Sequence, residues 1–200
     1  MLTAFQNFLY NCAISFDLPV LDWIQANMQS GFMDKFMPFI TVFGDAGIFW
    51  MIWAALLLIF PKTRKTGLGM AIAMVFGLIV CNMTLKPLVA RIRPYDLQAE
   101  LGVAIQLLCE AQHDFSFPSG HTIASFEAAV VLLKNSKKMG IPAMILAVLI
   151  SFSRMYLYVH YPTDVIVSVI LGTLFALIGD AIAAKIAPKL SFGKKGKFEA

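Results

Sequence analysis

Charged residues are scarce in this chain. Asp, Glu, Lys and Arg make up only 14% of its 200 residues, whereas 59% are hydrophobic and the mean hydropathy is +0.76. Soluble domains average about 25% charged and roughly 45–50% apolar residues. The composition therefore excludes an ordinary soluble domain, and it predicts an integral membrane protein with a single domain over residues 1–200.

Metal-binding patterns are also lacking. The three cysteines, Cys12, Cys81 and Cys109, show no CxxC or related spacing, and no carboxylate cluster is visible. We therefore expect no catalytic metal and no other cofactor. The pairing of Cys12 with Cys109 in a disulfide is left open. The N-terminus has no basic region before its interrupted apolar stretch, so we expect no cleavable signal peptide.

Long apolar runs are present, and they predict the membrane core. Five runs approach the length of a transmembrane helix: 46–61, 66–85, 121–133, 139–157 and 163–184. Residues 1–44 are broken by polar residues, including Asp17, and are expected to form interfacial amphipathic helices. A sixth span within residues 1–30 is the alternative. The predicted fold is an all-α membrane bundle of five to six transmembrane helices, with a core over 45–185 and a basic tail over 186–200.

Lys and Arg are unevenly distributed along the chain. Most of the 16 lie in the segments 62–65, 134–138 and 185–197, which flank one end of the predicted helices. The positive-inside rule places that end in the cytoplasm, together with the C-terminus. We expect the positive charge to serve membrane orientation rather than nucleic-acid binding.

Three polar clusters lie at the opposite, extracytoplasmic ends of these helices, at residues 86–94, 117–121 and 153–164. Lys86, Arg93 and Arg154 contribute three cations, and Arg can grip two oxygens at once. Ser119 and Gly120 precede a predicted helix, whose free N–H groups attract phosphate. These residues predict an anion site.

Two imidazoles complete the site. His121 and His160 titrate near neutral pH, so one can attack phosphorus while the other donates a proton to the leaving oxygen. Asp164, four residues after His160, is placed to hold an imidazole in the required tautomer.

These motifs resemble a known family. Lys86-x6-Arg93-Pro94, Pro118-Ser119-Gly120-His121 and Ser153-Arg154-x5-His160-x3-Asp164 are similar to the three signatures of the type 2 phosphatidic acid phosphatase superfamily. That superfamily also includes vanadium haloperoxidases and bacterial lipid pyrophosphatases. The resemblance covers roughly residues 80–175, and no motif position departs from the pattern.

The resemblance implies a role for each matching residue. His160 would be the nucleophile that forms a phosphohistidine, Asp164 would orient it, and His121 would protonate the leaving group and later activate water. The phosphate-binding residues would be Lys86, Arg93, Ser119, Gly120 and Arg154. Members of the family need no divalent metal.

The expected substrate is a lipid phosphate at the outer face of a bacterial plasma membrane. Similar small bacterial members include undecaprenyl pyrophosphate phosphatases, so hydrolysis of undecaprenyl diphosphate to undecaprenyl phosphate and phosphate, a step of cell-wall biogenesis, is the favoured prediction. Phosphatidylglycerophosphate or phosphatidate is the nearest alternative substrate. A lipid phosphotransferase and a non-enzymatic membrane transporter are the alternative activities. The oligomeric state is not predicted.

Several further residues receive structural interpretations. Arg91 is expected at the level of the lipid headgroups, and Asp114 as a solvated loop residue. Tyr156 and Tyr158 are expected in the interfacial aromatic belt. Asp180 is expected to face the bundle or the cytoplasmic interface.

Overall fold

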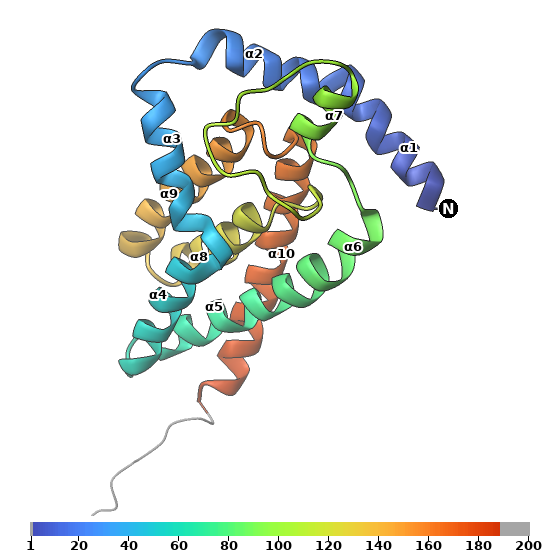
Figure 1. Ribbon diagram of the computed structural model, residues 1–200. Coiled ribbons are helices and arrows are strands. Elements are labelled where there is room, and N and C mark those ends of the chain that lie inside the picture. The colour runs from blue at the N-terminus through green and yellow to red at the C-terminus, as the bar shows by residue number, and fades with distance from the viewer. Residues whose placement is uncertain (1, 189–200) are drawn as a thin grey trace, which may run out of the picture.

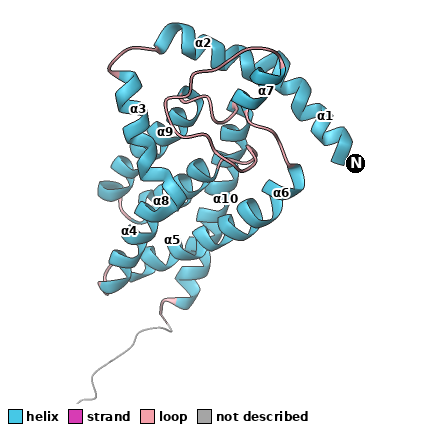
Figure 2. Cartoon of the chain, viewed as in Figure 1, coloured by secondary structure: helices cyan, strands magenta, loops and turns pink. Residues whose placement is uncertain are grey.

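The computed structural model describes residues 2–188, and this part of the chain contains helices and loops but no strand (Figure 2). An all-helical fold was predicted, and it is confirmed. The elements in chain order are α1 (Leu2–Cys12), η1 (Ala13–Asp17), α2 (Leu18–Met28), α3 (Met33–Thr41), η2 (Val42–Gly47), α4 (Ile48–Ile59), α5 (Arg64–Phe76), η3 (Gly77–Leu85), α6 (Lys86–Val89), α7 (Pro94–Glu100), α8 (Gly120–Asn135), α9 (Lys137–Tyr156) and α10 (Pro162–Ile186). The residues predicted for the basic tail lie mostly outside the described range.

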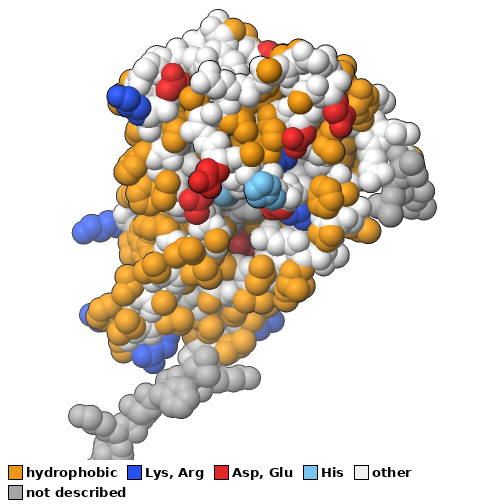
Figure 3. Space-filling view, in the orientation of Figure 1, with side chains coloured by type: hydrophobic (Ala, Val, Ile, Leu, Met, Phe, Trp, Pro, Cys, Tyr) orange, Lys and Arg blue, Asp and Glu red, His pale blue; other side chains and the backbone are white. Residues whose placement is uncertain are grey.

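Four helical stretches are long and apolar enough to cross a membrane. They are Met33–Ile59, Arg64–Glu100, Lys137–Tyr156 and Pro162–Ile186. Apolar side chains cover much of the face in Figure 3, as expected for a surface that contacts lipid. Within residues 2–32 no such stretch occurs. The helices α1 and α2 instead run across one end of the bundle (Figure 1).

The first span is longer than predicted. Residues 33–44 were assigned to an interfacial helix, but α3, η2 and α4 follow one another as a single apolar stretch, Met33–Ile59. Residues 44–47 form a kink inside this stretch, where Asp45 and Ala46 leave helical geometry.

Helix α8 occupies the centre of the bundle. It packs against α5, α9 and α10, and Ala128, Ala129, Val131 and Leu132 are fully buried. This helix corresponds to the predicted span 121–133. Its central position holds the residues at its start, Gly120 and His121, in the middle of the molecule.

An ion cluster joins three helices at the end of the bundle away from α1 and α2. The Asp180 carboxylate of α10 lies 3.2 Å from Lys65 Nζ of α5 and 2.9 Å from Lys134 Nζ of α8, and it accepts a 2.8 Å hydrogen bond from Asn135. Asp180 is buried. The expectation that it faces the bundle is confirmed.

Candidate active site

The turn between α9 and α10 brings Arg154 and His160 together. The backbone N–H groups of Val159 and His160 both donate to the carbonyl oxygen of Arg154, at 3.1 and 3.2 Å. Tyr158 adopts a positive φ of 60° to close this turn, and its hydroxyl donates to Asp22 of α2 at 2.6 Å. The chain thus doubles back, so that both side chains start from one hydrogen-bonded turn.

The two tyrosines of this region differ from their prediction. Tyr156 and Tyr158 are buried rather than interfacial. The Tyr156 hydroxyl lies 2.5 Å from an Asp34 oxygen, in the same way as Tyr158 contacts Asp22. The reason is that α2 and α3 cover the turn, so these rings pack between helices.

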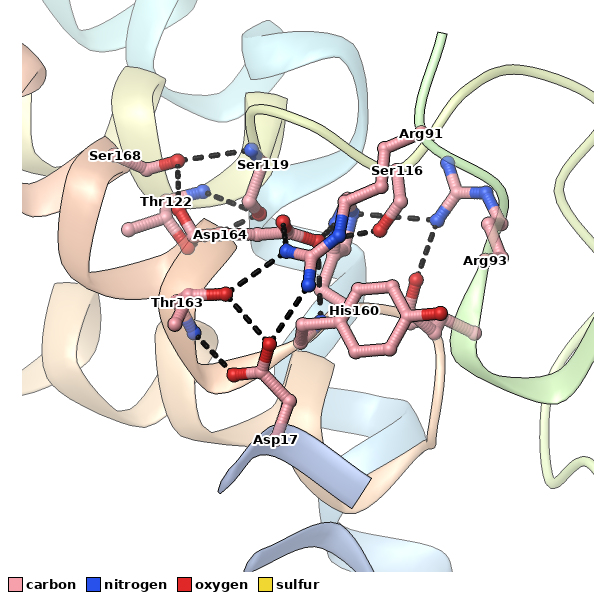
Figure 4. A network of polar contacts seen from close by, with 12 residues as sticks. Asp17, Arg91, Arg93, Ser116, Ser119, Thr122, His160, Thr163, Asp164 and Ser168 are labelled. Atoms are coloured by element: carbon pink, nitrogen blue, oxygen red, sulfur yellow. Dashed lines mark hydrogen bonds and ion pairs between the residues drawn. The ribbon is translucent and has the colours of Figure 1, made fainter. Parts of the chain in front are cut away.

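His160 is held between a cation and a carboxylate (Figure 4). Its Nε2 lies 3.3 Å from Nη1 of Arg93, and its Nδ1 lies 3.6 Å from an oxygen of Asp164. Burial, and then the charges of Arg93 and Arg154, lower the pKa of His160 well below its usual value. The imidazole is therefore neutral near pH 7, which keeps a lone pair free for nucleophilic attack.

Asp164 is fully buried and belongs to a larger network (Figure 4). Its carboxylate accepts hydrogen bonds from Arg91, from the Ser116 hydroxyl, and from the Tyr161 N–H at 3.1 Å. It therefore caps the start of α10 as well as lying beside His160. These bonds fix the carboxylate, although its 3.6 Å separation from His160 exceeds an ordinary hydrogen bond.

The predictions for Arg91 and for Asp17 are both wrong. Arg91 is buried rather than placed among headgroups, and it pairs with both Asp164 and Asp17, the latter at 2.7 Å. Asp17 does not end the first helix: α1 continues through η1 into α2, and Asp17 also accepts the Thr163 hydroxyl at 2.7 Å. A buried cation needs such partners, and only the folded chain brings these residues together.

Lys86 and Arg93 share one carboxylate. The two oxygens of Asp114 pair separately with Lys86 and Arg93. Partial burial acts to raise the pKa of Asp114, but the hydrogen bonds and charges of Lys86 and Arg93 outweigh it and lower the pKa to about 2. Asp114 was predicted as a solvated loop residue. It is 54% exposed, yet it occupies the cations predicted to bind phosphate.

Arg154 is buried and only partly paired. Its Nη1 donates to the Thr41 hydroxyl at 2.7 Å, while its Nε and Nη2 have no hydrogen-bond partner within the described residues. Burying guanidinium donors without acceptors is unfavourable. This arrangement therefore favours an anionic ligand.

Ser119 and Gly120 occupy different environments. Ser119 is buried, and its N–H donates to Ser168 at 2.8 Å. Its hydroxyl accepts from the backbone N–H of Thr122 at 3.5 Å and from the Thr122 hydroxyl at 3.1 Å. Ser119 thereby caps α8. Gly120 lies on the wall of the central cavity.

His121 pairs with a residue that the motifs did not indicate. Its Nε2 lies 2.8 Å from an oxygen of Asp45, within the kink of the first span. The run Gly44-Asp45-Ala46-Gly47 is visible in the sequence as a helix break that contains a charge. Its position beside His121 depends on packing between helices far apart in the chain.

A cavity of about 610 Å³ connects these groups. Its polar end is lined by Lys86, Arg93, His121, Arg154 and His160. Its other end runs between α4, α5 and α8 and is lined mainly by apolar residues, including Met51, Leu58, Met74 and Leu78. The cavity thus joins a phosphate-sized cluster of cations to an apolar groove.

The described residues contain no group of three His, Cys, Asp or Glu side chains that could hold a metal ion. Cys12, Cys81 and Cys109 are free thiols.

Fold and site together define a helical membrane phosphatase. Residues 65–186 match the model of the PAP2 superfamily, and the chain belongs to this superfamily. All eight predicted site residues fall inside the matched range. The chain is thus a multi-pass membrane protein and a lipid phosphatase, as predicted.

Relatives and solved structures agree with this assignment. The chain is 34% identical over 166 residues to an undecaprenyl-diphosphatase of Sulfolobus acidocaldarius, covering 82% of this chain and 77% of the relative. It is 29% identical to undecaprenyl-diphosphatase BcrC of Bacillus subtilis, covering 75% and 77%. The crystal structure of LpxE of Aquifex aeolicus superposes with a TM-score of 0.72 at 25% identity, covering 82% and 94%. A PAP2-type phosphatidylglycerolphosphate phosphatase of Bacillus subtilis gives 0.68 at 26%, covering 92% and 95%.

Proposed function

We propose that the chain hydrolyses undecaprenyl diphosphate to undecaprenyl phosphate and phosphate, through a phosphohistidine on His160, at the extracytoplasmic face of a bacterial plasma membrane. The observation that carries the proposal is the single cavity that joins two imidazoles and three cations to an apolar groove. A phosphate on a long apolar chain is a ligand that fits both ends.

The first half-reaction breaks the bond between the terminal phosphorus and the leaving oxygen. The neutral His160 Nε2 attacks phosphorus, His121 gives its proton to the leaving oxygen, and an N–P bond forms. Lys86, Arg93 and Arg154 stabilise the charge on the equatorial oxygens, after the phosphate has displaced Asp114 from Lys86 and Arg93. Asp164 stabilises the His160 ring as it becomes positive.

The second half-reaction releases phosphate. Water loses a proton to His121 and attacks phosphorus, and the N–P bond breaks, which returns His160 to its neutral form. Gly120 borders the cavity, whereas Ser119 supports the site by capping α8. Ser119 would therefore contribute to phosphate binding through its support of α8, and Gly120 through its position at the cavity.

The choice of undecaprenyl diphosphate rests on the relatives named for that activity. Phosphatidylglycerophosphate is the second candidate, because a structure of a phosphatidylglycerolphosphate phosphatase resembles 92% of the chain. The extracytoplasmic face rests on the clustering of Lys and Arg at the opposite helix ends. A fluorescent protein that folds only in the cytoplasm, fused to the C-terminus, tests that orientation.

A panel of lipids tests the activity. Purified protein in detergent receives undecaprenyl diphosphate, phosphatidylglycerophosphate or phosphatidate without added magnesium, and released phosphate is measured with and without an acceptor lipid. We expect the fastest release from undecaprenyl diphosphate, inhibition by vanadate, no effect of EDTA, and loss of release in His160→Ala. Activity that survives His160→Ala would contradict the phosphohistidine. Transfer to the acceptor instead of water would indicate a phosphotransferase.

A further inference from the structure

The kink of the first span has an unusual backbone. Asp45 has a ψ of 120°, and the two residues after it have positive φ angles, 48° at Ala46 and 67° at Gly47. A left-handed alanine is unfavourable, and such conformations persist where the surrounding structure holds them in place. The kink lies at the cavity, where Gly44, Ala46 and Gly47 form part of the wall.

The kink surrounds one imidazole ring. A Cβ atom at Gly44 would lie 2.6 Å from His121 Cδ2, so only glycine admits the ring at this distance. On the next ring atom, Nε2 lies 2.8 Å from Oδ1 of Asp45. The remaining edge of the ring carries Nδ1, which makes no hydrogen bond within the described residues.

We propose that Asp45 is a positioning residue for His121: its carboxylate holds a proton on Nε2, so that Nδ1 is the nitrogen that exchanges a proton with substrate and water. This inference rests on the proposed function. It adds a second carboxylate–imidazole pair to the site, contributed by the first span, which lies outside the three motifs and outside the matched range 65–186.

The assignment specifies the path of each proton. In the imidazolium form both nitrogens carry a proton. The Nδ1 proton moves to the leaving oxygen as its bond to phosphorus breaks, and the Nε2 proton stays shared with Asp45. In the second half-reaction Nδ1 takes a proton from the attacking water, which restores the imidazolium. The proton count of the enzyme is unchanged after one turnover.

Charge supports the same assignment. Burial, together with the nearby positive charges of Arg154 and Lys86, opposes the imidazolium form of His121, whereas the Asp45 carboxylate in contact with the ring favours it. Without that carboxylate, a smaller fraction of His121 would carry the proton that the leaving oxygen needs.

Leaving-group dependence tests the inference. Asp45→Ala should lower kcat for a lipid phosphomonoester by about 100-fold with little change in KM, because an alkoxide must be protonated as it leaves. The first-turnover release of p-nitrophenol from p-nitrophenyl phosphate, whose leaving group needs no proton, should slow by less than about 3-fold. Asp34→Ala is the matched control, since Asp34 lies on the same stretch and contacts Tyr156 instead.

Two further variants distinguish a specific effect of Asp45 from misfolding. Asp45→Asn keeps the size of the side chain and should show the same selective loss. In a His121→Ala background, Asp45→Ala should cause no additional loss. Equal losses in the first-turnover rate on both substrates in Asp45→Ala and Asp45→Asn, or no loss on either, would overturn the inference.

Nitrogen-15 NMR of the imidazoles, assigned with His121→Ala, separates this inference from the proposed function. At a pH where His121 is neutral, the wild-type protein should show the proton on Nε2, and Asp45→Ala should show a mixture of tautomers. An unchanged tautomer in Asp45→Ala would overturn the pairing. Failure of the wild-type protein to release phosphate from any substrate would instead overturn the proposed function.

Discussion

The two polar clusters at the opposite ends of the bundle differ in how their cations are partnered. At one end, the single carboxylate of Asp180 contacts two lysines, Lys65 and Lys134, whose side chains are 40% and 49% exposed. At the other end, Arg154 is buried with two unpartnered nitrogens, and Lys86 and Arg93 depend on Asp114, an exposed loop carboxylate.

This difference distinguishes a structural cluster from a binding site. The ammonium groups of Lys65 and Lys134 are solvated by water and also pair with Asp180. The Asp180 cluster therefore needs no ligand to satisfy its charges. Buried donors without acceptors destabilise the folded protein, and a phosphate would satisfy them. The cation pocket, defined by Lys86, Arg93 and Arg154, therefore lowers the stability of the folded protein while it favours the binding of an anion.

Arg154→Gln should have the largest effect on this comparison. Loss of one cation that stabilises transition-state charge should lower kcat/KM by about 100- to 1,000-fold. The melting temperature should stay the same or rise, because a buried and partly unpaired charge is removed. Phosphate release and thermal unfolding, measured on the same preparation, check both parts. A clear fall in melting temperature would show that Arg154 is structural.

Asp114→Asn should strengthen anion binding. The neutral side chain competes less for Lys86 and Arg93, so the inhibition constant of vanadate should fall by about 10-fold, which corresponds to about 1.4 kcal/mol. Asp96→Asn, at an exposed carboxylate in the first turn of α7, is the control. Weaker vanadate binding in Asp114→Asn would mean that Asp114 orients the cations rather than competing for them.

Asp180→Asn should show the opposite pattern to Arg154→Gln. Removing its charge leaves Lys65 and Lys134 free to turn to water, so stability should fall by only about 1 kcal/mol. The value of kcat should stay within about 2-fold. A large loss of activity would show that the Asp180 cluster is coupled to the site. It would then not be a purely structural cluster.

Acid should reduce stability through His160. Its pKa is lowered in the folded protein, so the unfolded chain binds more protons below about pH 6.5. Stability should therefore fall as the pH falls below that value, by at most about 1.4 kcal/mol per pH unit. Thermal unfolding of His160→Gln should show a shallower dependence, with the same substitution at exposed His113 as the control. Equal slopes in both variants would contradict this origin.

Local patterns in the sequence were sufficient to predict the fold class and the cations and imidazoles at the polar end of the cavity. Uninterrupted apolar runs predict membrane helices because lipid leaves the backbone no other partners. The three motifs predicted the imidazoles and the cations, and Lys86, Arg93, His121, Arg154 and His160 do line one cavity. Each motif carries its own residue types and spacing, so no contact between distant segments had to be known.

The partners of these residues were decided only by tertiary structure. Asp17 and Asp45 look like helix breakers in the sequence, yet one pairs with Arg91 and the other with His121. Arg91 and Arg93 stand two positions apart, yet one is enclosed between carboxylates and the other faces the cavity. The pairing of a charge depends on which distant segments pack against it, and that information is absent from local spacing. The sequence alone identified the candidate imidazoles and cations. Packing decided which of these charges pair with carboxylates and which have donors without an acceptor within the described residues.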